Sequence, residues 1–543
     1  MAEYFRRLAS YASQNRVAVV NPASSGTFPP RQYTYDELLS RVTVYREHLV
    51  TAAQRTQKTL KGARVGLMAR PGVDFVAALL GVWSVEAIVV PICLTHPLQE
   101  ITYTVTDSDQ DFIIYDSEFW QTIKPLVKGR VGIDISSISQ DATPNQIMDF
   151  STFEWPVDSP CLIIYTSGTT GAPKGVVYTA QSSEYGFQSL EKTWQLRPSD
   201  WVLHVLPLHH GHGLNLSLLL PLWSGATVEF MTKFDESLVW QRFVDASLPP
   251  ITVFMAVPTI WVKMIAYFDR RFGTDRGGEN TKVEAKRYKH AAASLRLAIS
   301  GSAALPGSIR DAWAGIANGY LLLERYGTTE TGILYSGSLD PGGRILGSVG
   351  WPVDGVQTRL IASDGQDVSN VPNSMGEIQV KTAGLMKEYW RKPDAKSKDL
   401  TSDGWWKTGD LAMIKDEHQK ATFIQGRASA DIIKSGGYKI SGLEIEAAML
   451  QLPFVSEVAV VGVPDSVWGE MVAAICVPVK GREDELTVAN VRAELRSLLA
   501  PYKLPQKVHL LQTMPRNAMG KVQKKTLREK CFPQMGNGVS AKL

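Results

Sequence analysis

The most constraining feature of the sequence is the stretch Cys161–Val177, in which an apolar strand runs into a glycine-rich turn. Residues 161–164 are apolar, and the turn that follows reads YTSGTTGAPKG. Its three glycines permit positive φ angles and a close approach of the backbone, so that several N–H groups can point at one anion. Lys174 adds a full positive charge. The stretch therefore predicts a cradle for a polyphosphate.

Two other interpretations of this turn have to be weighed. Surface loops rich in Gly, Ser and Thr are frequent, but the buried strand, the lysine and the density of hydroxyl groups argue against a plain loop. A Walker A loop fails on spacing. Counted from Gly168, that motif needs Gly before its lysine and Ser or Thr after it, whereas Pro173 and Gly175 stand there. We expect a phosphate-binding loop outside the P-loop NTPases.

Length and composition limit the class of protein. A chain of 543 residues is long for one hydrophobic core and predicts two or more domains. The net charge of +3 gives no argument for a nucleic-acid partner. No apolar run reaches the roughly 20 residues of a membrane span, so we expect none. The four cysteines are far apart, which favours reduced thiols in an intracellular compartment.

Alternating strands and helices predict an α/β fold for the first 300 residues. Apolar strands at 65–68, 87–91 and 112–115 alternate with a helix at 73–84, a pattern typical of a mainly parallel sheet flanked by helices. Ligands gather at the carboxyl ends of such strands. Further strands are expected at 201–206, 251–257 and 296–299.

The pattern changes twice in the remaining chain. From Gly355 short alternating strands predict a β-rich subdomain, and a compact α+β pattern follows after about Gly426. We therefore expect a large N-terminal domain, residues 1–426, and a small mobile C-terminal domain, residues 427–543. The polar segment 273–290 is interpreted as an exposed loop.

The string YTSGTTGAPKGV resembles the phosphate-binding loop of the adenylate-forming superfamily, which includes acyl-CoA synthetases, peptide-synthetase adenylation domains and luciferases. The strings VFMAVPTIW, ERYGTTE, GSVGWPVDGV and DIIKSGGYKI are most similar to malonyl-CoA synthetases, and the resemblance covers nearly the whole chain. It implies a ligase that uses ATP, Mg²⁺ and CoA and passes through an acyl adenylate, with malonate or a related short dicarboxylic acid as substrate. A CoA ligase for another small, branched or aromatic monocarboxylic acid, or an acyl-adenylate transferase to a carrier protein, stays open.

The same resemblance implies a nucleotide site. Glu330 would hold Mg²⁺, Thr329 would contact the α-phosphate, and the ring of Tyr326 would lie on adenine. A carboxylate just past a strand suits Mg²⁺, which takes one or two protein oxygens besides phosphate oxygens; a solvated or capping acid in a turn is the alternative. The residues implied for ATP and AMP are Thr166, Ser167, Gly168, Thr169, Thr170, Ser302, Tyr326, Asp410 and Arg427.

The roles of Asp410, Arg427 and Lys521 are implied by the resemblance far more than by the residues themselves. Asp410 would accept from both ribose hydroxyls, although an Asp in a turn is a weak signal alone, and Arg427 would contact the ribose or a phosphate. Lys521, in PRNAMGK, would bridge the substrate carboxylate and the α-phosphate during adenylation, whereas alone it would be taken for a surface lysine. The residues implied for catalysis are Lys521, Thr329, Glu330 and Lys174.

The resemblance also implies that the small domain rotates between two half-reactions. The loop with Gly436, Gly437 and Tyr438 would then line the tunnel for the CoA thiol arm, because glycines allow a close approach. The linker is one residue longer than the commonest form. The pivot is therefore either Ser429 or Asp431.

The candidates for binding the acid are His210, Arg296, Ser300 and Gly301. Arg296 stands just before the strand that ends in SGSA and is implied to receive a distal carboxylate through two hydrogen bonds; an internal ion pair is the alternative. Two positions depart from relatives: His209 replaces an aromatic residue, and Lys263 replaces an Arg found in some. The histidines of the segment 209–212 have no Cys or acid beside them, so we interpret them as packed at the pocket wall and not as metal ligands.

The last three residues, Ala541, Lys542 and Leu543, resemble the peroxisomal import tripeptide Ser-Lys-Leu. A Gly-Asn-Gly stretch before them would expose such a signal. We therefore expect the peroxisomal import receptor as a partner and the peroxisome as the location, or otherwise the cytoplasm.

Overall fold

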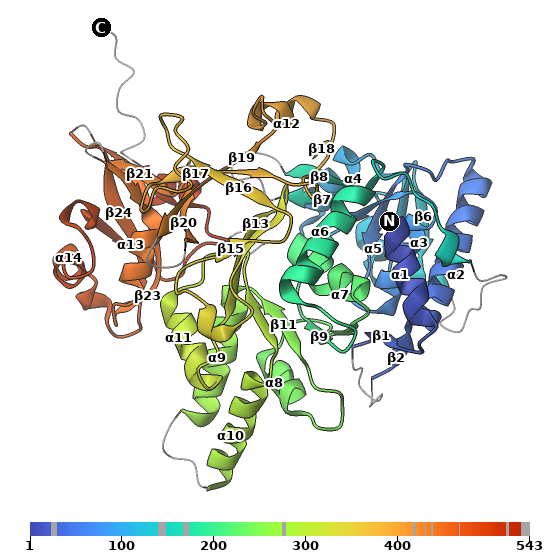
Figure 1. Cartoon of the computed structure of the whole chain (residues 1–543), viewed down its shortest axis with the longest axis horizontal. Coiled ribbons are helices and arrows are strands. Elements are labelled where there is room, and N and C mark those ends of the chain that lie inside the picture. Colours follow the sequence, from blue (N-terminus) through green and yellow to red (C-terminus); the bar gives the residue numbers. More distant parts are fainter. Residues whose placement is uncertain are drawn as a thin grey trace.

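The computed structural model describes residues 1–22, 30–138, 148–166, 173–273, 279–415, 420–428, 430–435, 438–465, 467–516 and 521–533. In Figure 1 a large body, coloured blue to yellow, carries a smaller orange and red part beside strands β19 and β20.

The first large sheet has seven strands in the order β18-β8-β7-β4-β3-β5-β6. Its centre is parallel, whereas β8 pairs antiparallel with both β7 and β18. The central strands are apolar along their whole length and buried, as parallel strands covered on both faces must be. The strands are β3 (Arg64–Met68), β4 (Ile88–Pro91), β5 (Phe112–Tyr115), β6 (Val131–Asp134), β7 (Pro160–Thr166), β8 (Lys174–Thr179) and β18 (Glu388–Tyr389).

The second large sheet has nine strands in the order β15-β14-β13-β12-β11-β9-β10-β1-β2. The strands from β1 to β13 along this order are parallel, and β2, β14 and β15 pair antiparallel at its two edges. The strands are β1 (Val17–Val20), β2 (Gln32–Thr34), β9 (Trp201–His204), β10 (Thr227–Phe230), β11 (Val253–Ala256), β12 (Leu297–Ser300), β13 (Leu323–Thr328), β14 (Gly332–Ser336) and β15 (Trp351–Pro352).

Helices cover these two sheets, and one of them contradicts the sequence interpretation. The polar segment 273–290 was expected to be a loop, but most of its described part is helix, because Tyr288 and Ala292 are buried one turn apart in an otherwise polar sequence. The helices are α1 (Ala2–Ala12), α2 (Tyr35–Thr56), α3 (Val73–Trp83), α4 (Leu98–Asp107), α5 (Trp120–Ile123), α6 (Ala180–Trp194), the π-helix η4 (His212–Leu219), α7 (Leu220–Trp223), α8 (Glu236–Val244), α9 (Pro258–Phe272), α10 (Glu279–Ala293), α11 (Gly307–Ile316) and α12 (Pro393–Asp399).

Two smaller sheets follow in the chain. An antiparallel sheet forms the β-rich subdomain with β16 (Gln357–Ile361), β17 (Gly376–Lys381), β19 (Trp406–Lys415) and β20 (Ala421–Arg427). The last sheet contains β21 (Ile432–Ser435), β22 (Tyr438–Ser441), β23 (Val455–Asp465), β24 (Gly469–Pro478) and β25 (Lys507–Leu510), with helices α13 (Gly442–Met449), α14 (Val488–Leu495) and α15 (Lys524–Cys531).

This small part has hydrophobic cores of its own, whose described members begin at Ile433. The buried members of the main core of the larger part end at Ala412, and Ile424 packs against them. The predicted fold class, a large α/β part with mainly parallel sheets and a β-rich subdomain followed by a small α+β part, is confirmed. Within the described ranges, no helix combines the length and the apolar character that a membrane crossing needs.

Candidate active site

A cleft of about 2710 Å³ opens where strands of both large sheets end and meet the β-rich subdomain and the small C-terminal part. The carboxyl ends of parallel strands are where such folds bind ligands. The predicted residues that line the cleft are Thr166, Lys174, His210, Ser300, Ser302, Tyr326, Thr329, Glu330, Asp410, Arg427 and Lys521. Those outside the described residues are Ser167, Gly168, Thr169, Thr170, Gly436 and Gly437.

At the phosphate end of the cleft, Tyr389 contacts both Lys174 and Glu330. The sequence did not indicate Tyr389. The Nζ atom of Lys174 lies 4.7 Å from the ring centroid of Tyr389, and the Tyr389 hydroxyl donates to Glu330 Oε1 at 2.8 Å. The hydroxyl of Tyr178 donates to the backbone oxygen of Thr329. Both tyrosines fix the carboxylate segment in place. Tyr389 belongs to β18, far away in the sequence, and no local pattern points to it.

The other end of the cleft is organised around the buried carboxylate of Asp410. Arg427 donates to it from Nε at 2.7 Å and from Nη2 at 3.2 Å, and the hydroxyl of Tyr326 donates to Oδ2. The hydrogen bond with Asp410 raises the pKa of Arg427 above its ordinary value. Burial, and after it the charge of Asp410, raises the pKa of Tyr326, so that its hydroxyl remains a donor.

Lys521 enters this cleft from the small C-terminal part. Lys521 keeps solvent exposure while it lines the cleft. Desolvation there lowers the pKa of Lys521, and the guanidinium groups of Arg427 and Arg325 lower it further, while Glu330 and Asp410 oppose them. These charges act on Lys521 because it lies among them. The lysine is thus near both the predicted metal ligand and the predicted ribose acceptor.

The region expected to hold the acid contains a buried arginine, Arg325, next to the end of β12. Its side chain is 7 % exposed, and burial lowers its pKa to about 10. In the described part of the chain it makes no ion pair, and its Nε has no hydrogen-bond partner. A Cβ atom on Gly301 would lie 2.4 Å from this Nε, so only glycine leaves room for the guanidinium.

Two side chains beside Arg325 also have polar atoms without a partner among the described residues, namely His212 Nε2 and Ser300 Oγ. Ser302 lies 3.2 Å from Nδ1 of His212 through its Oγ, and its own φ of 69° is in the left-handed region. Buried polar groups in native proteins are normally hydrogen-bonded. The set therefore fits a polar, anionic group of a ligand. Arg325 was not among the predicted residues; a charged residue inside the motif ERYGTTE is the sequence signal that could have indicated it.

Arg296 does not belong to this region, and its predicted role is wrong. It lies at the amino end of β12, outside the lining of the cleft, and donates from Nε to Asp200 Oδ1 at 3.0 Å. Asp200 is 1 % exposed. The internal ion pair, which the sequence left open as the alternative, is what the structure contains.

The histidines after β9 are neutral at physiological pH. Burial, then the charge of Lys521, lowers the pKa of His210 to about 4, and burial together with His210 and His96 lowers that of His209 to about 2. The rings of His209 and His210 lie 3.9 Å apart between centroids. His210 lines the cleft near Lys521, and its role in binding the acid stays a prediction.

The predicted CoA-binding residue Tyr438 does not line the cleft, although its stacking partner Tyr502 does. It is exposed and stacks on Tyr502, with ring centroids 4.2 Å apart. The linker before it is fixed by Asp431, which accepts from the backbone N–H of Arg427 at 2.9 Å and pairs with Lys524 of α15. The other predicted pivot, Ser429, and the predicted import signal at Ala541, Lys542 and Leu543 lie outside the described residues.

Comparisons with known proteins agree with this geometry. The AMP-binding enzyme family model matches residues 5–390, and that of the AMP-binding enzyme C-terminal domain matches residues 444–521. The chain is 35 % identical to malonate–CoA ligase ACSF3, mitochondrial, of Homo sapiens over 91 % of this chain and 88 % of that protein. It is 36 % identical to malonate–CoA ligase of Arabidopsis thaliana over 97 % and 89 %. The crystal structure of ATP-bound MatB from Rhodopseudomonas palustris superposes with a TM-score of 0.82 at 28 % identity, covering 97 % of this chain and 98 % of that one.

Proposed function

This chain belongs to the AMP-binding enzyme family, and we propose that it is an ATP-dependent acyl-CoA synthetase whose acid is malonate. The reaction converts a carboxylate, ATP and CoA to an acyl-CoA, AMP and pyrophosphate through an acyl adenylate. The observation that carries the choice of malonate is the buried Arg325, which has no ion pair within the described residues.

The first half-reaction brings two anions together, because a carboxylate oxygen attacks the α-phosphorus of ATP while pyrophosphate leaves. Positioning and positive charge must therefore supply most of the rate enhancement. Three side chains supply positive charge in the cleft. Lys521 comes from the small C-terminal part, Arg427 lies next to Asp410, and Lys174 lies at the phosphate end. We assign to Lys521 the role of holding the attacking carboxylate against the α-phosphate.

Glu330 fits a magnesium ligand. It is a carboxylate at the phosphate end of the cleft, held in place by the hydroxyl of Tyr389. Mg²⁺ prefers one or two protein carboxylates together with phosphate oxygens. When bound there, Mg²⁺ would neutralise phosphate charge.

Malonate differs from a monocarboxylic acid by its second carboxylate, which brings a second negative charge into the pocket. A buried cation without a counter-charge is costly, on the order of several kcal/mol. A second carboxylate at Arg325 would remove that cost through two charge-assisted hydrogen bonds. His212 and Ser300 supply further polar atoms beside it. Lys263, which also lines the cleft, is exposed and suits the entrance better than the end of the pocket.

The second half-reaction requires another arrangement. Lys521 lies in the cleft while Tyr438 lies outside it and exposed, which suits adenylation. We propose that residues 427–543 rotate as a unit about the linker near Asp431. The rotation would withdraw Lys521 and bring the segment 436–438 to the cleft, where the CoA thiol attacks the acyl adenylate and AMP leaves.

The experiment that tests malonate measures pyrophosphate release with malonate, methylmalonate, succinate, propionate and benzoate, in the presence and absence of CoA. We expect malonate to give the highest kcat/KM and acyl-CoA to form only with CoA. The Arg325→Met variant should lose about 10²-fold or more in kcat/KM for malonate and much less for propionate. The matched control, Lys263→Met, removes an exposed cation from the same cleft and should change the ratio little.

Three results would overturn parts of the proposal. Rapid turnover of a monocarboxylate with malonate inert would exclude malonate as the substrate. An equal loss for both acids in the Arg325→Met variant, at an unchanged melting temperature, would exclude Arg325 as the recognition residue. Transfer to a carrier protein without any use of CoA would indicate an acyl-adenylate transferase.

A further inference from the structure

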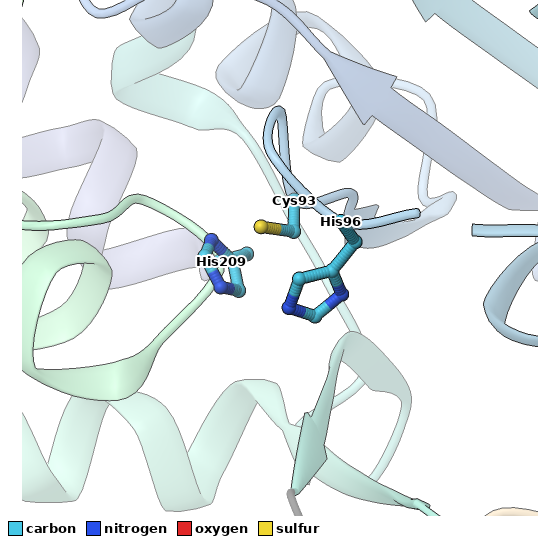
Figure 2. A group of neighbouring side chains, drawn as sticks. All are labelled: Cys93, His96 and His209. Atoms are coloured by element: carbon cyan, nitrogen blue, oxygen red, sulfur yellow. The ribbon is translucent and has the colours of Figure 1, made fainter. Parts of the chain in front are cut away.

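A group of potential metal ligands lies in the wall of the cleft and has no part in the proposed reaction. One ligand atom each of Cys93, His96 and His209 lies within 4.8 Å of the others. Figure 2 shows the thiol of Cys93 pointing toward the ring of His209, with the ring of His96 beside them. Over the described ranges of the chain, this is the one group of three or more His, Cys, Asp or Glu side chains that meets such a spacing.

The group could not be seen in the sequence because it joins two sheets. Cys93 and His96 follow β4 of the seven-stranded sheet, and His209 follows β9 of the nine-stranded sheet. The histidines around His209 looked incomplete as a metal site because no cysteine lies near them in the sequence. The fold supplies that cysteine from more than a hundred residues away.

We propose that Cys93, His96 and His209 form a binding site for one transition-metal ion, with Zn²⁺ as the ion that this donor set favours. A thiolate and two imidazoles suit Zn²⁺, whereas Mg²⁺ and Ca²⁺ require oxygen ligands. Zinc ligands lie about 2.0–2.3 Å from the ion, so ligand atoms of a tetrahedral site are roughly 3.3–3.8 Å apart. The present separations, 4.8 Å or less, exceed that spacing by no more than about 1.5 Å, so a bound ion would draw the three side chains together.

Polar groups lie behind His96 and beside Cys93, where they could orient these two residues as metal ligands. Nδ1 of His96 lies 3.2 Å from Oε2 of Glu100, so that a carboxylate stands behind the ring and Nε2 is the nitrogen left to face a metal. The hydroxyl of Thr95 lies 3.4 Å from the sulfur of Cys93 and can donate to a thiolate. A carboxylate behind a ligating histidine fixes the tautomer and the direction of the ring.

The site is of the open kind, with three protein ligands. Cys93 and His209 both line the cleft. A fourth position on the ion would therefore face the cleft, where water or an oxygen of a bound anion can occupy it. Binding would also tie the segment after β4 to the segment after β9, which stabilises the folded chain by mass action. The proposal does not depend on which acid the enzyme uses.

The alternative is that the three side chains only pack together, since the rings of His96 and His209 lie 5.3 Å apart in an edge-to-face arrangement. Titration separates the two. The full chain, freed of metal with a chelator, is titrated with Zn²⁺ by calorimetry and with Co²⁺ by absorption spectroscopy. We expect one equivalent of Zn²⁺ to bind with release of protons, because the thiol must ionise. Co²⁺ should give a thiolate-to-cobalt charge-transfer band.

The variants Cys93→Ser, His96→Gln and His209→Asn should each weaken Zn²⁺ binding by at least about tenfold, and Cys93→Ser should abolish the cobalt band. Cys531→Ser and His290→Asn, which change a cysteine and an exposed histidine elsewhere, are the matched controls and should bind as the unaltered chain does. Melting temperatures in excess chelator identify a variant that fails to fold; His96, with a side chain 20 % exposed, is the ligand best able to tolerate a change.

Two results would overturn the proposal. One is the absence of stoichiometric Zn²⁺ binding by the unaltered chain. The other is a pair of findings: the folded His96→Gln variant binds Zn²⁺ as tightly as the unaltered chain does, and the Co²⁺ spectrum of the unaltered chain lacks the thiolate band.

Discussion

Arg427 and Asp410 form a two-point ion pair, with Nε 2.7 Å from Oδ1 and Nη2 3.2 Å from Oδ2. The two residues are partners in the register of β19 and β20, so the pair closes the end of the β-rich sheet that faces the cleft. Tyr326 from the nine-stranded sheet donates to the same carboxylate. Asp410 therefore holds three elements together at the place where a nucleoside is proposed to bind.

We expect Asp410→Asn to weaken ATP binding by roughly 10²-fold, or about 2–3 kcal/mol. The amide cannot accept from Arg427 and from ribose hydroxyls at the same time, and it leaves the guanidinium without its counter-charge. Calorimetric titration with ATP measures the effect. Asp403→Asn, which alters an exposed carboxylate paired with Arg359, is the control and should bind ATP normally. Unchanged affinity in Asp410→Asn would remove this residue from the nucleotide site.

Lys521→Ala separates the two half-reactions. Its charge lies in the cleft only in the arrangement proposed for adenylation, so pyrophosphate release should fall by about 10²-fold or more. Formation of the thioester from an acyl adenylate added ready-made should change little, because that step uses the other arrangement. Lys530→Ala, on the exposed side of α15, should affect neither. Equal losses in both half-reactions would contradict the division of labour between the two arrangements.

Glu324 makes stability depend on pH. Burial raises the pKa of its carboxyl to about 8, and Arg310, at 3.8 Å, opposes this only in part. In the unfolded chain the pKa returns to its ordinary value of about 4.5. Between these values the folded state holds a proton that the unfolded state has released, so stability falls as pH rises from about 4.5 to about 8.

Glu324→Gln should remove that fall, which is on the order of 5 kcal/mol at most. Melting temperatures at intervals from pH 5 to pH 8 measure it, and the difference between variant and unaltered chain should grow with pH. Glu154→Gln, at a side chain 87 % exposed, is the control. If the melting temperatures of the unaltered chain and of Glu324→Gln changed in parallel from pH 5 to pH 8, the Glu324 carboxyl would be ionised in the folded state.

Residues that lie in a contiguous motif could be predicted from the sequence, because the motif as a whole resembles that of a known family. Tyr326, Glu330 and Asp410 were predicted by this rule, and all three line the cleft. Arg325 and Arg296 show where the rule stops. Both flank or occupy apolar strands, and only the fold decides which one faces the cleft and which one meets a carboxylate 96 residues away.

Contacts between separate sheets could not be predicted from the sequence either, because only the fold brings such residues together. Tyr389 reaches Glu330 from β18, and Cys93 reaches His209 across two sheets, with no local signal for either. The helix α10 was missed because its two buried positions, Tyr288 and Ala292, are few among charged residues. In that segment tertiary packing, and not periodicity, stabilises the helix.

The pairing of Arg296 with Asp200 gives a prediction about stability and not about substrate choice. Asp200 accepts from Nε of Arg296 and also from the hydroxyl of Thr252 at 2.9 Å, at the end of β12 opposite the cleft. Arg296→Met leaves a nearly inaccessible carboxylate without its counter-charge, which costs about 3–5 kcal/mol. Thermal or denaturant unfolding measures the loss. Arg271→Met breaks an exposed pair with Glu284 and should cost less than about 1 kcal/mol. The ratio of malonate to propionate turnover, per folded molecule, should be the same in Arg296→Met as in the unaltered chain. A selective loss of malonate turnover at unchanged stability would return Arg296 to the acid-binding site.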